Sequence, residues 1–141
     1  MTERAPLLEV CPLIPFPSNN PRRGDELAIE YIDELEAAWA VDERNLIAVA
    51  EEDPLDVYRL LLRLDDTRRE VFRALGSSEI VLSPIGPKAM ALGCLLAAIE
   101  RDMPVVYVET LRYGEPPIGP SPPSSGHLLY FWLSGEAYEN T

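Results

Sequence analysis

The sequence has few of the residues that build metal centres. His127, Cys11 and Cys94 are its only histidine and cysteines. A zinc site needs a cluster of such ligands, so no metal and no cofactor are predicted. Both cysteines lie in apolar segments, which indicates buried, unreactive thiols in a reducing compartment. No GxSxG elbow supplies a serine nucleophile beside the histidine, so the catalytic residues of any reaction are unknown.

Long apolar runs are absent too. The longest, Ala89 to Ile99, is shorter than the roughly 20 residues that cross a bilayer as a helix. The first residues include Glu3 and Arg4 and do not follow the pattern of a secretory signal. We therefore expect a cytoplasmic protein without a membrane partner.

Basic residues are scarce as well. The chain has 12 lysines and arginines against 24 aspartates and glutamates, and its formal net charge is −12. Such a surface repels phosphate backbones at long range, so duplex nucleic acid is not an expected partner, whereas a small anionic ligand is compatible with it. At 141 residues and 47% hydrophobic composition, the chain is expected to fold as one domain, residues 1–141, around one core.

The most informative stretch is Glu79 to Glu109. Two apolar runs rich in β-branched residues, Ile80 to Leu82 and Val105 to Val108, flank a helix that is apolar on nearly all sides. This pattern is typical of a βαβ unit in a parallel sheet that helices cover on both faces. Glu79 to Ser83 is expected to be the middle strand of that sheet.

Apolar spacing and turn residues predict the other elements. In chain order these are a strand over Leu7 to Phe16, a helix capped by Ser18 or Asn20 that ends near Trp39, a strand over Asn45 to Ala50, a helix from Pro54 to Gly76, a Pro-rich surface loop or flap over 111–126, and an edge strand over His127 to Leu133. This order predicts an α/β fold, a three-layer α/β/α sandwich with a mainly parallel Rossmann-like sheet of about five strands.

Three details of the helices are also predicted. Asp53 is expected to cap the second helix, with Pro54 at its first position. Asp65 and Asp66 are expected to break or bend this helix. The first helix is expected to bury one face, which is made of Ala28, Tyr31, Ile32, Leu35 and Trp39.

In a parallel sheet, the turns that follow the strands gather at one edge, where open α/β folds bind ligands. The turn from Ser83 to Lys88 leads into a helix N-terminus, whose free amides favour an anion. Gly86 allows a ligand to approach the backbone closely, and Lys88 adds a mobile positive charge. Together with residues from the other turns, the predicted ligand-binding residues are Ser83, Gly86, Lys88, Asn20, Arg22, Arg23, Glu51 and Tyr113.

Each of these residues also has a purely structural interpretation. The prolines of the turn are compatible with a tight connection that leaves Lys88 in solvent, and the adjacent arginines with ion pairs to neighbouring acids. Glu51 and Asp53 are compatible with capping and solvation, and Tyr113 with packing on its own domain.

The segment SPIGPKAMALG, with its Gly86-Pro87-Lys88 turn, resembles the CRISPR-associated Rossmann-fold (CARF) domains, which sense cyclic oligoadenylates or similar nucleotides. In that family a buried strand ends in a Gly-Thr-Lys-like turn before a helix of small residues, and the upstream DPLDVYRLLLRL helix is similar too. Pro87 stands in place of the hydroxyl residue, so only Lys88 is carried over from the motif. The resemblance covers about half the chain. It implies a nucleotide-sized ligand at the sheet edge and is compatible with a homodimer.

Three functions agree with these features. The leading one is a non-enzymatic sensor or binding domain for a nucleotide, including a cyclic oligonucleotide, or another phosphorylated small molecule. The second is an enzyme that acts on a nucleoside or phosphorylated substrate with Glu51 or Asp53 as general base. The third is a protein-interaction module without a ligand.

Overall fold

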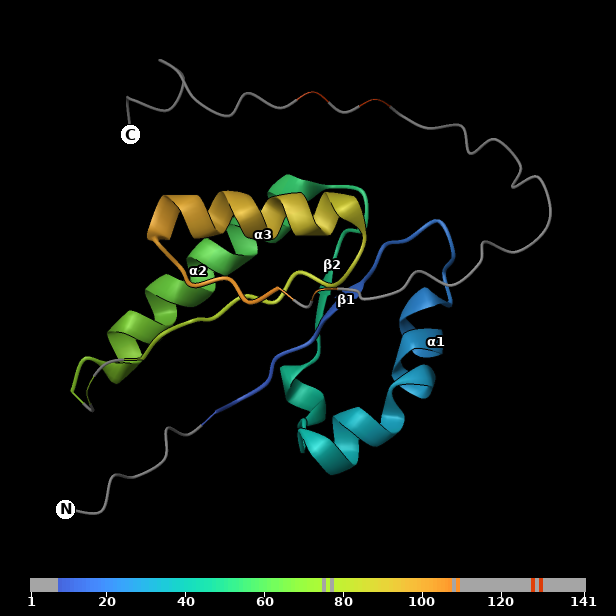
Figure 1. The fold of residues 1–141 in the computed structure, drawn as a ribbon, viewed down its shortest axis with the longest axis horizontal. Coiled ribbons are helices and arrows are strands. Elements are labelled where there is room, and N and C mark those ends of the chain that lie inside the picture. Colours follow the sequence, from blue (N-terminus) through green and yellow to red (C-terminus); the bar gives the residue numbers. More distant parts are fainter. Residues whose placement is uncertain are drawn as a thin grey trace. The chain divides into compact units, whose positions relative to one another are not determined.

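The computed structural model describes residues 8–74, 76, 78–107, 109, 128 and 130. The chain divides into two compact units, Met1–Tyr107 and Val108–Thr141, and the elements below belong to the first. Figure 1 shows them in chain order: β1 (Leu13–Pro15), α1 (Arg23–Glu30), the π-helix η1 (Glu34–Ala38), the 3₁₀-helix η2 (Glu43–Asn45), β2 (Ile47–Val49), α2 (Pro54–Phe72) and α3 (Lys88–Arg101).

β1 and β2 form a two-stranded parallel sheet in which Leu13 lies opposite Ile47. Backbone hydrogen bonds extend the pairing at both ends. The Phe16 amide donates to the Val49 carbonyl at 2.7 Å, and the Ile47 amide donates to the Pro12 carbonyl at 3.0 Å. A parallel pair needs a crossover connection, and α1 lies within it. The predicted parallel direction of these two strands is confirmed.

The prediction of a three-layer sandwich with about five strands is wrong. Among the described residues, β1 and β2 are the strands, and residues 79–83 contribute one parallel bridge, from Leu82 to Val105. The Leu82 amide donates to the Pro104 carbonyl at 2.9 Å, and the Val106 amide donates to the Leu82 carbonyl at 2.8 Å. Pro84 and Pro104 have no amide hydrogen to donate, which limits the pairing to this short stretch.

The side chains beside this bridge explain why a sandwich was the wrong expectation. Val81 is 49% exposed and Val106 is 54% exposed. A doubly covered parallel sheet would bury both. The apolar runs therefore supply one buried position, Leu82, rather than a strand that is buried on two faces.

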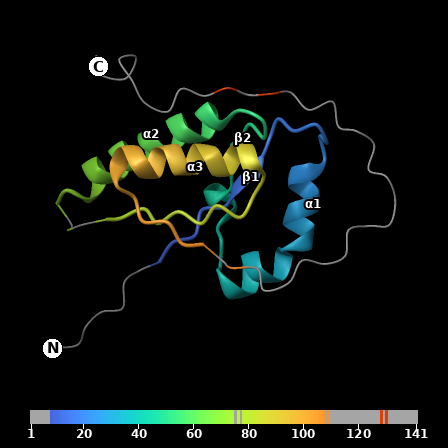
Figure 2. The same cartoon turned by 45° about the horizontal axis from the view of Figure 1, so that its top comes forward.

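The core is built mainly by α2 and α3, which pack against each other (Figures 1 and 2). Gly93 is the point of closest approach. A Cβ atom added there would lie 2.4 Å from the Pro54 carbonyl oxygen and 2.7 Å from the Val57 Cβ. Only a glycine lets the two backbones come this near. The buried apolar residues are Val49, Val57, Leu61, Leu82, Met90, Cys94, Ala97, Ala98 and Met103.

Asp65 is the one buried acidic side chain among the described residues, and it joins the two helices. Its carboxylate accepts a hydrogen bond from Arg69 at 2.9 Å and lies 3.8 Å from Arg101 of α3. Arg101 in turn lies 3.0 Å from the Asp66 carboxylate. The expected break at Asp65 and Asp66 is wrong, because arginines on the same and the facing helix compensate both charges and α2 runs without interruption.

The ends of α2 agree with the sequence. The Asp53 side chain accepts a hydrogen bond from the Leu55 amide at 2.9 Å, so Asp53 is the N-cap and Pro54 is at the first helical position, as predicted. Gly76, with φ of 122°, follows the helix, and its amide donates to the Phe72 carbonyl at 3.1 Å.

The segment from α1 to η1 departs from the prediction, since none of its residues is buried. Its apolar residues are either half-buried or exposed, and Ile29 is 72% exposed. Cys11 is exposed as well, so the expectation of two buried thiols holds for Cys94 alone. Burial raises the pKa of the Cys94 thiol. The part of the Cys11 side chain that is shielded from water raises the pKa of that thiol too.

The remaining expectations lie outside the described residues. These are the loop or flap over 111–126, with Tyr113, and the edge strand over 127–133, of which only residues 128 and 130 are described. Within the described part of the chain, no helix combines the length and the apolar character needed to cross a membrane.

The close approach at Gly93 predicts a large effect of a small substitution. Gly93→Ala should lower the free energy of unfolding by about 1–3 kcal/mol, although alanine favours helix, because its methyl group overlaps the Pro54 backbone and forces the helices apart. Urea unfolding measures this change. The control is Gly86→Ala, whose methyl group would meet no atom within 4 Å, and a change beyond about 0.5 kcal/mol there would count against the steric explanation.

Candidate functional site

A cavity of about 340 Å³ lies where the chain leaves β1 and β2 and where α3 begins. This is the carboxyl edge of the parallel pair, the place where open α/β folds bind ligands. Its lining combines one arginine, two glutamates, three small polar side chains and two apolar residues: Arg23, Glu51, Glu52, Ser18, Asn19, Asn20, Pro87 and Ala89.

Two of its walls are tied together by hydrogen bonds across 33 positions of sequence. The Glu51 amide donates to the Pro17 carbonyl at 3.1 Å, so the backbone pairing of β1 and β2 continues into the two turns. The Ser18 hydroxyl donates to the Glu51 carboxylate, and the Asn19 amide group donates to the Glu52 carboxylate. These bonds hold both glutamates against the first turn, with carboxylate oxygens left that can accept more hydrogen bonds.

The first turn also positions Arg23. The Asn20 side chain accepts a hydrogen bond from the Arg22 amide at 3.0 Å and donates one to Glu26 at 2.9 Å. Arg23 begins α1 and lies 4.0 Å from the Glu26 carboxylate, with 43% of its side chain exposed. This exposed pair is weak. The Arg23 guanidinium therefore has donors available to a ligand in the cavity.

The second turn is held by two aspartates. Asp53 caps α2, and Asp56 in the first turn of α2 accepts a hydrogen bond from the Ala50 amide at 2.9 Å. The latter bond fixes the end of β2 to the helix that follows it. Glu51 and Glu52 are thereby placed on a short, doubly anchored connection.

The third wall is the beginning of α3. Pro87 is its N-cap residue and offers no side-chain hydrogen bond to the free amides of the first turn. Pro87 and Ala89 both line the cavity. The first amides of a helix lack partners within the helix and, with the helix dipole, favour a negative charge.

The structure brings some of the predicted site residues together. Asn20, Arg23 and Glu51 line the cavity. Lys88 is the first, exposed residue of α3, and Ser83, Gly86 and Arg22 are exposed as well, but none of these four is part of the lining.

Other lining residues were not singled out as ligand-binding from the sequence. The sequence predicts Ser18 as a helix cap and gives Asn19 and Ala89 no role of their own. The sequence gives Asn19 only a weak signal, because it is one of several turn-forming residues in a row. Its role depends on Glu52, which lies 33 positions away in the sequence.

The charged lining residues carry one positive and two negative charges, so the cavity suits a ligand with both anionic and hydroxyl groups. Among the described residues, no three histidine, cysteine or acidic side chains gather as a metal ion would require. No protein-family model matches the sequence, and no curated protein is significantly similar to it.

The anchoring role of Asp56 can be tested by removing its carboxylate. Asp56→Ala should lower the free energy of unfolding by about 1–3 kcal/mol, because the Ala50 amide loses a charge-assisted bond near a helix N-terminus. Chemical denaturation measures the loss. Glu70→Ala, an exposed carboxylate of the same helix, is the control, and an equal loss in both variants would contradict the anchoring role.

Proposed function

We propose that the protein is a non-enzymatic binding domain for a nucleotide or a similar phosphorylated small molecule, which sits in the cavity at the ends of β1 and β2. The observation that carries this proposal is the lining itself. Arg23 and the first turn of α3 favour a phosphate, while Glu51 and Glu52 favour hydroxyl donors, and a nucleotide presents both groups.

The two kinds of group divide the recognition between them. A phosphate accepts hydrogen bonds from the Arg23 guanidinium and the free amides of α3, and it is repelled by carboxylates. Ribose hydroxyls donate to carboxylates, as in other open α/β nucleotide sites. Pro87 and Ala89 add a small apolar surface for the rest of the ligand. The volume of about 340 Å³ lies at the lower end of the range for small-molecule pockets.

The resemblance of the 79–109 stretch to CARF domains supports the same class of ligand. Lys88, the residue carried over from that motif, lies one position from the lining residues Pro87 and Ala89. Its ammonium group acts on a bound phosphate from outside the lining. We therefore expect Lys88 to contribute less to affinity than Arg23 does.

Catalysis has weaker support. Asp53 is engaged as the cap of α2, and Glu51 accepts the hydroxyl hydrogen of Ser18. Both contacts are structural, and no observation favours either carboxylate as a general base.

The role of Arg23 gives the test of this function. Calorimetry with ADP and with a cyclic oligoadenylate should show binding of at least one of them, and Arg23→Ala should weaken it at least tenfold. A charge-assisted contact to phosphate is worth about 1.5–3 kcal/mol, which is ample for that factor. Lys88→Ala should have a smaller effect.

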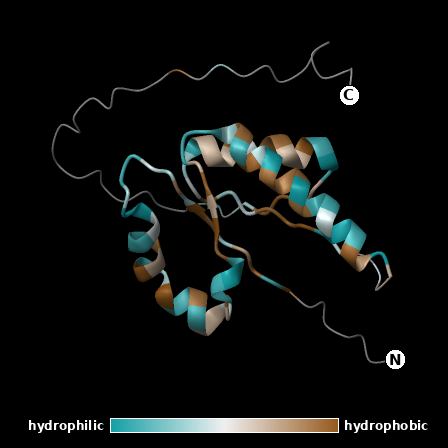
Figure 3. Cartoon of the chain, turned by 180° about the vertical axis from the view of Figure 1, so that it is seen from behind, coloured by the Kyte–Doolittle hydropathy of each residue, from teal (hydrophilic) through white to brown (hydrophobic). Residues whose placement is uncertain are grey.

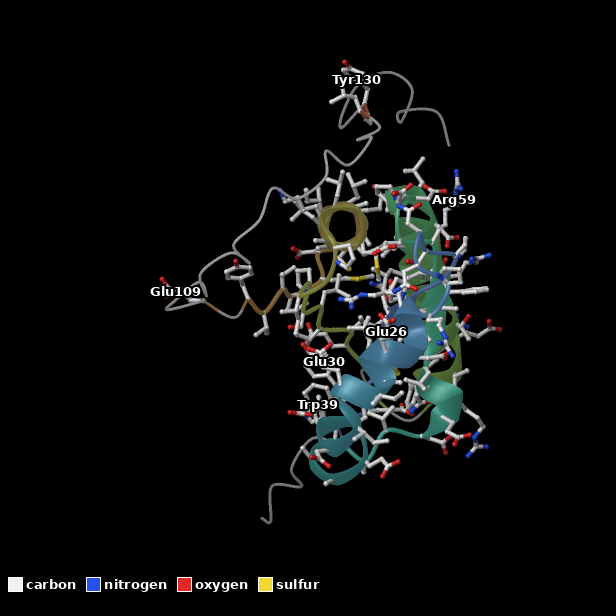
Figure 4. All side chains as sticks on the ribbon, turned by 90° about the vertical axis from the view of Figure 1, so that its right-hand side faces the viewer. Glu26, Glu30, Trp39, Arg59, Glu109 and Tyr130 are labelled. Atoms are coloured by element: carbon white, nitrogen blue, oxygen red, sulfur yellow. The ribbon has the colours of Figure 1, made fainter. Side chains whose placement is uncertain are left out.

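Two controls make this result specific. Arg59→Ala removes an exposed arginine of α2, which Figure 4 shows well apart from Glu26 of α1, and should leave the affinity unchanged. Adenosine, which lacks phosphate, should bind less tightly than ADP. If neither nucleotide binds, or if the Arg23 and Arg59 variants lose affinity equally, the proposed site is refuted.

A further inference from the structure

Residues 24–43, here called the acidic segment, combine exposed apolar side chains with acidic ones and contain no basic residue. The segment contains eight aspartates and glutamates and no lysine or arginine. It comprises most of α1, all of η1 and the start of η2. Figure 3 shows hydrophobic and hydrophilic residues following each other along it.

The apolar side chains of the segment do not pack into the core. Ile29 is 72% exposed, and Ile32 and Trp39 are each 47% exposed. Ile29 lies in the last turn of α1, Ile32 follows the α1 C-cap Tyr31, and Trp39 is the C-cap residue of the π-helix η1. The backbone changes form between them. After α1 ends, the Leu35 amide donates to the Tyr31 carbonyl at 2.9 Å, and the Trp39 amide donates to the Glu34 carbonyl at 2.9 Å in a π-helical turn.

The negative charges near these apolar side chains are largely uncompensated. Asp42 is paired with Arg44, which lowers the Asp42 pKa through side-chain and backbone hydrogen bonds, and Glu26 contacts Asn20 and Arg23. Among the described residues, no hydrogen bond or ion pair reaches the side chains of the other six acids of the segment: Asp25, Glu30, Asp33, Glu34, Glu36 and Glu43. Figure 4 shows Glu26, Glu30 and Trp39 along this part of the chain.

We propose that the acidic segment is a docking surface for a basic amphipathic helix of another protein. The partner's apolar side chains would cover Ile29, Ile32 and Trp39, and its lysines or arginines would compensate the flanking carboxylates. This surface is separate from the cavity, so the proposal is independent of the proposed ligand.

Charge decides between this partner and other occupants of the surface. A second copy of the chain, with its net charge of −12, would meet the segment with the same sign of charge. The chain's own residues 108–141 contain four glutamates and one arginine, so they bring no basic complement either. Anionic membranes and nucleic acids are repelled in the same way.

The first part of the test establishes whether the surface is free. In the full chain with Trp132→Phe, Trp39 is the only tryptophan and reports on the segment. Acrylamide should quench its fluorescence efficiently at every protein concentration. Protection at all concentrations would mean that the chain covers its own surface, and protection that grows with concentration would mean a second copy; either result overturns the proposal.

The second part measures docking with a defined probe, a peptide of about 18 residues built from leucine and lysine at helical spacing. In the same Trp132→Phe chain, the peptide should shift the Trp39 emission to shorter wavelength and bind saturably, with affinity that falls as salt is raised. A peptide of the same composition without amphipathic spacing should bind at least tenfold less tightly.

Variants of exposed residues assign the effect to the segment. The double variant Ile29→Ser and Ile32→Ser, and separately Glu30→Gln with Glu34→Gln, should each weaken the peptide at least tenfold. The matched controls change exposed residues of α2, Val71→Ser with Glu70→Gln, and should change the affinity less than twofold. No binding, or equal weakening in test and control variants, would overturn the proposal.

Discussion

The contact between Gly93 of α3 and the start of α2 sets how closely the two helices that build the core pack together. Pro54 is the first residue of α2, directly after the turn that carries Glu51 and Glu52, and its carbonyl oxygen faces Gly93. α3 begins five residues before Gly93, so the same contact sets how far Ala89 stands from those glutamates. The dimensions of the cavity are therefore set both by the packing of two helices and by the pairing of β1 and β2, which continues into the two turns.

The charged residues of the cavity lining have the same ratio of one positive to two negative charges as the whole chain. One arginine and a helix N-terminus face two glutamates that neutral side chains, Ser18 and Asn19, hold by hydrogen bonds. Since neither glutamate is neutralised by a cation there, a purely anionic ligand meets repulsion from these two of the eight lining residues. The proposed ligand class, which carries hydroxyl groups as well as phosphate, is based on this arrangement.

The features that sequence alone predicted are those decided by near neighbours. Asp53 caps α2 because its carboxylate reaches an amide two residues on, and α3 forms because most of its residues, apart from Gly93, favour helix. The number of strands could not be predicted, since it depends on whether another layer covers Val81 and Val106. Asp65 shows the same limit in part, because one of its two arginine partners, Arg101, comes from α3.

For the candidate site, the sequence predicted the place in the fold but only some of the lining side chains. The topological rule located the edge correctly, since residues after β1, after β2 and before α3 do line one cavity. It could not tell which side chains of each turn point into it. Lys88 and Arg22 had the right charge and the right place in the chain, yet Arg23 is the cation of the lining, because the Asn20 turn engages the Arg22 backbone and α1 starts one residue later.

The bond between Ser18 and Glu51 has a consequence for how this chain diverges over time. The two half-buried side chains are each other's hydrogen-bond partners, so loss of the hydroxyl leaves the acid without this donor, and loss of the acid leaves the hydroxyl without this acceptor. Relatives should therefore carry both residues or replace both. Such paired change at positions 18 and 51 would leave a trace of this fold in an alignment even where the overall identity had become too low to recognise.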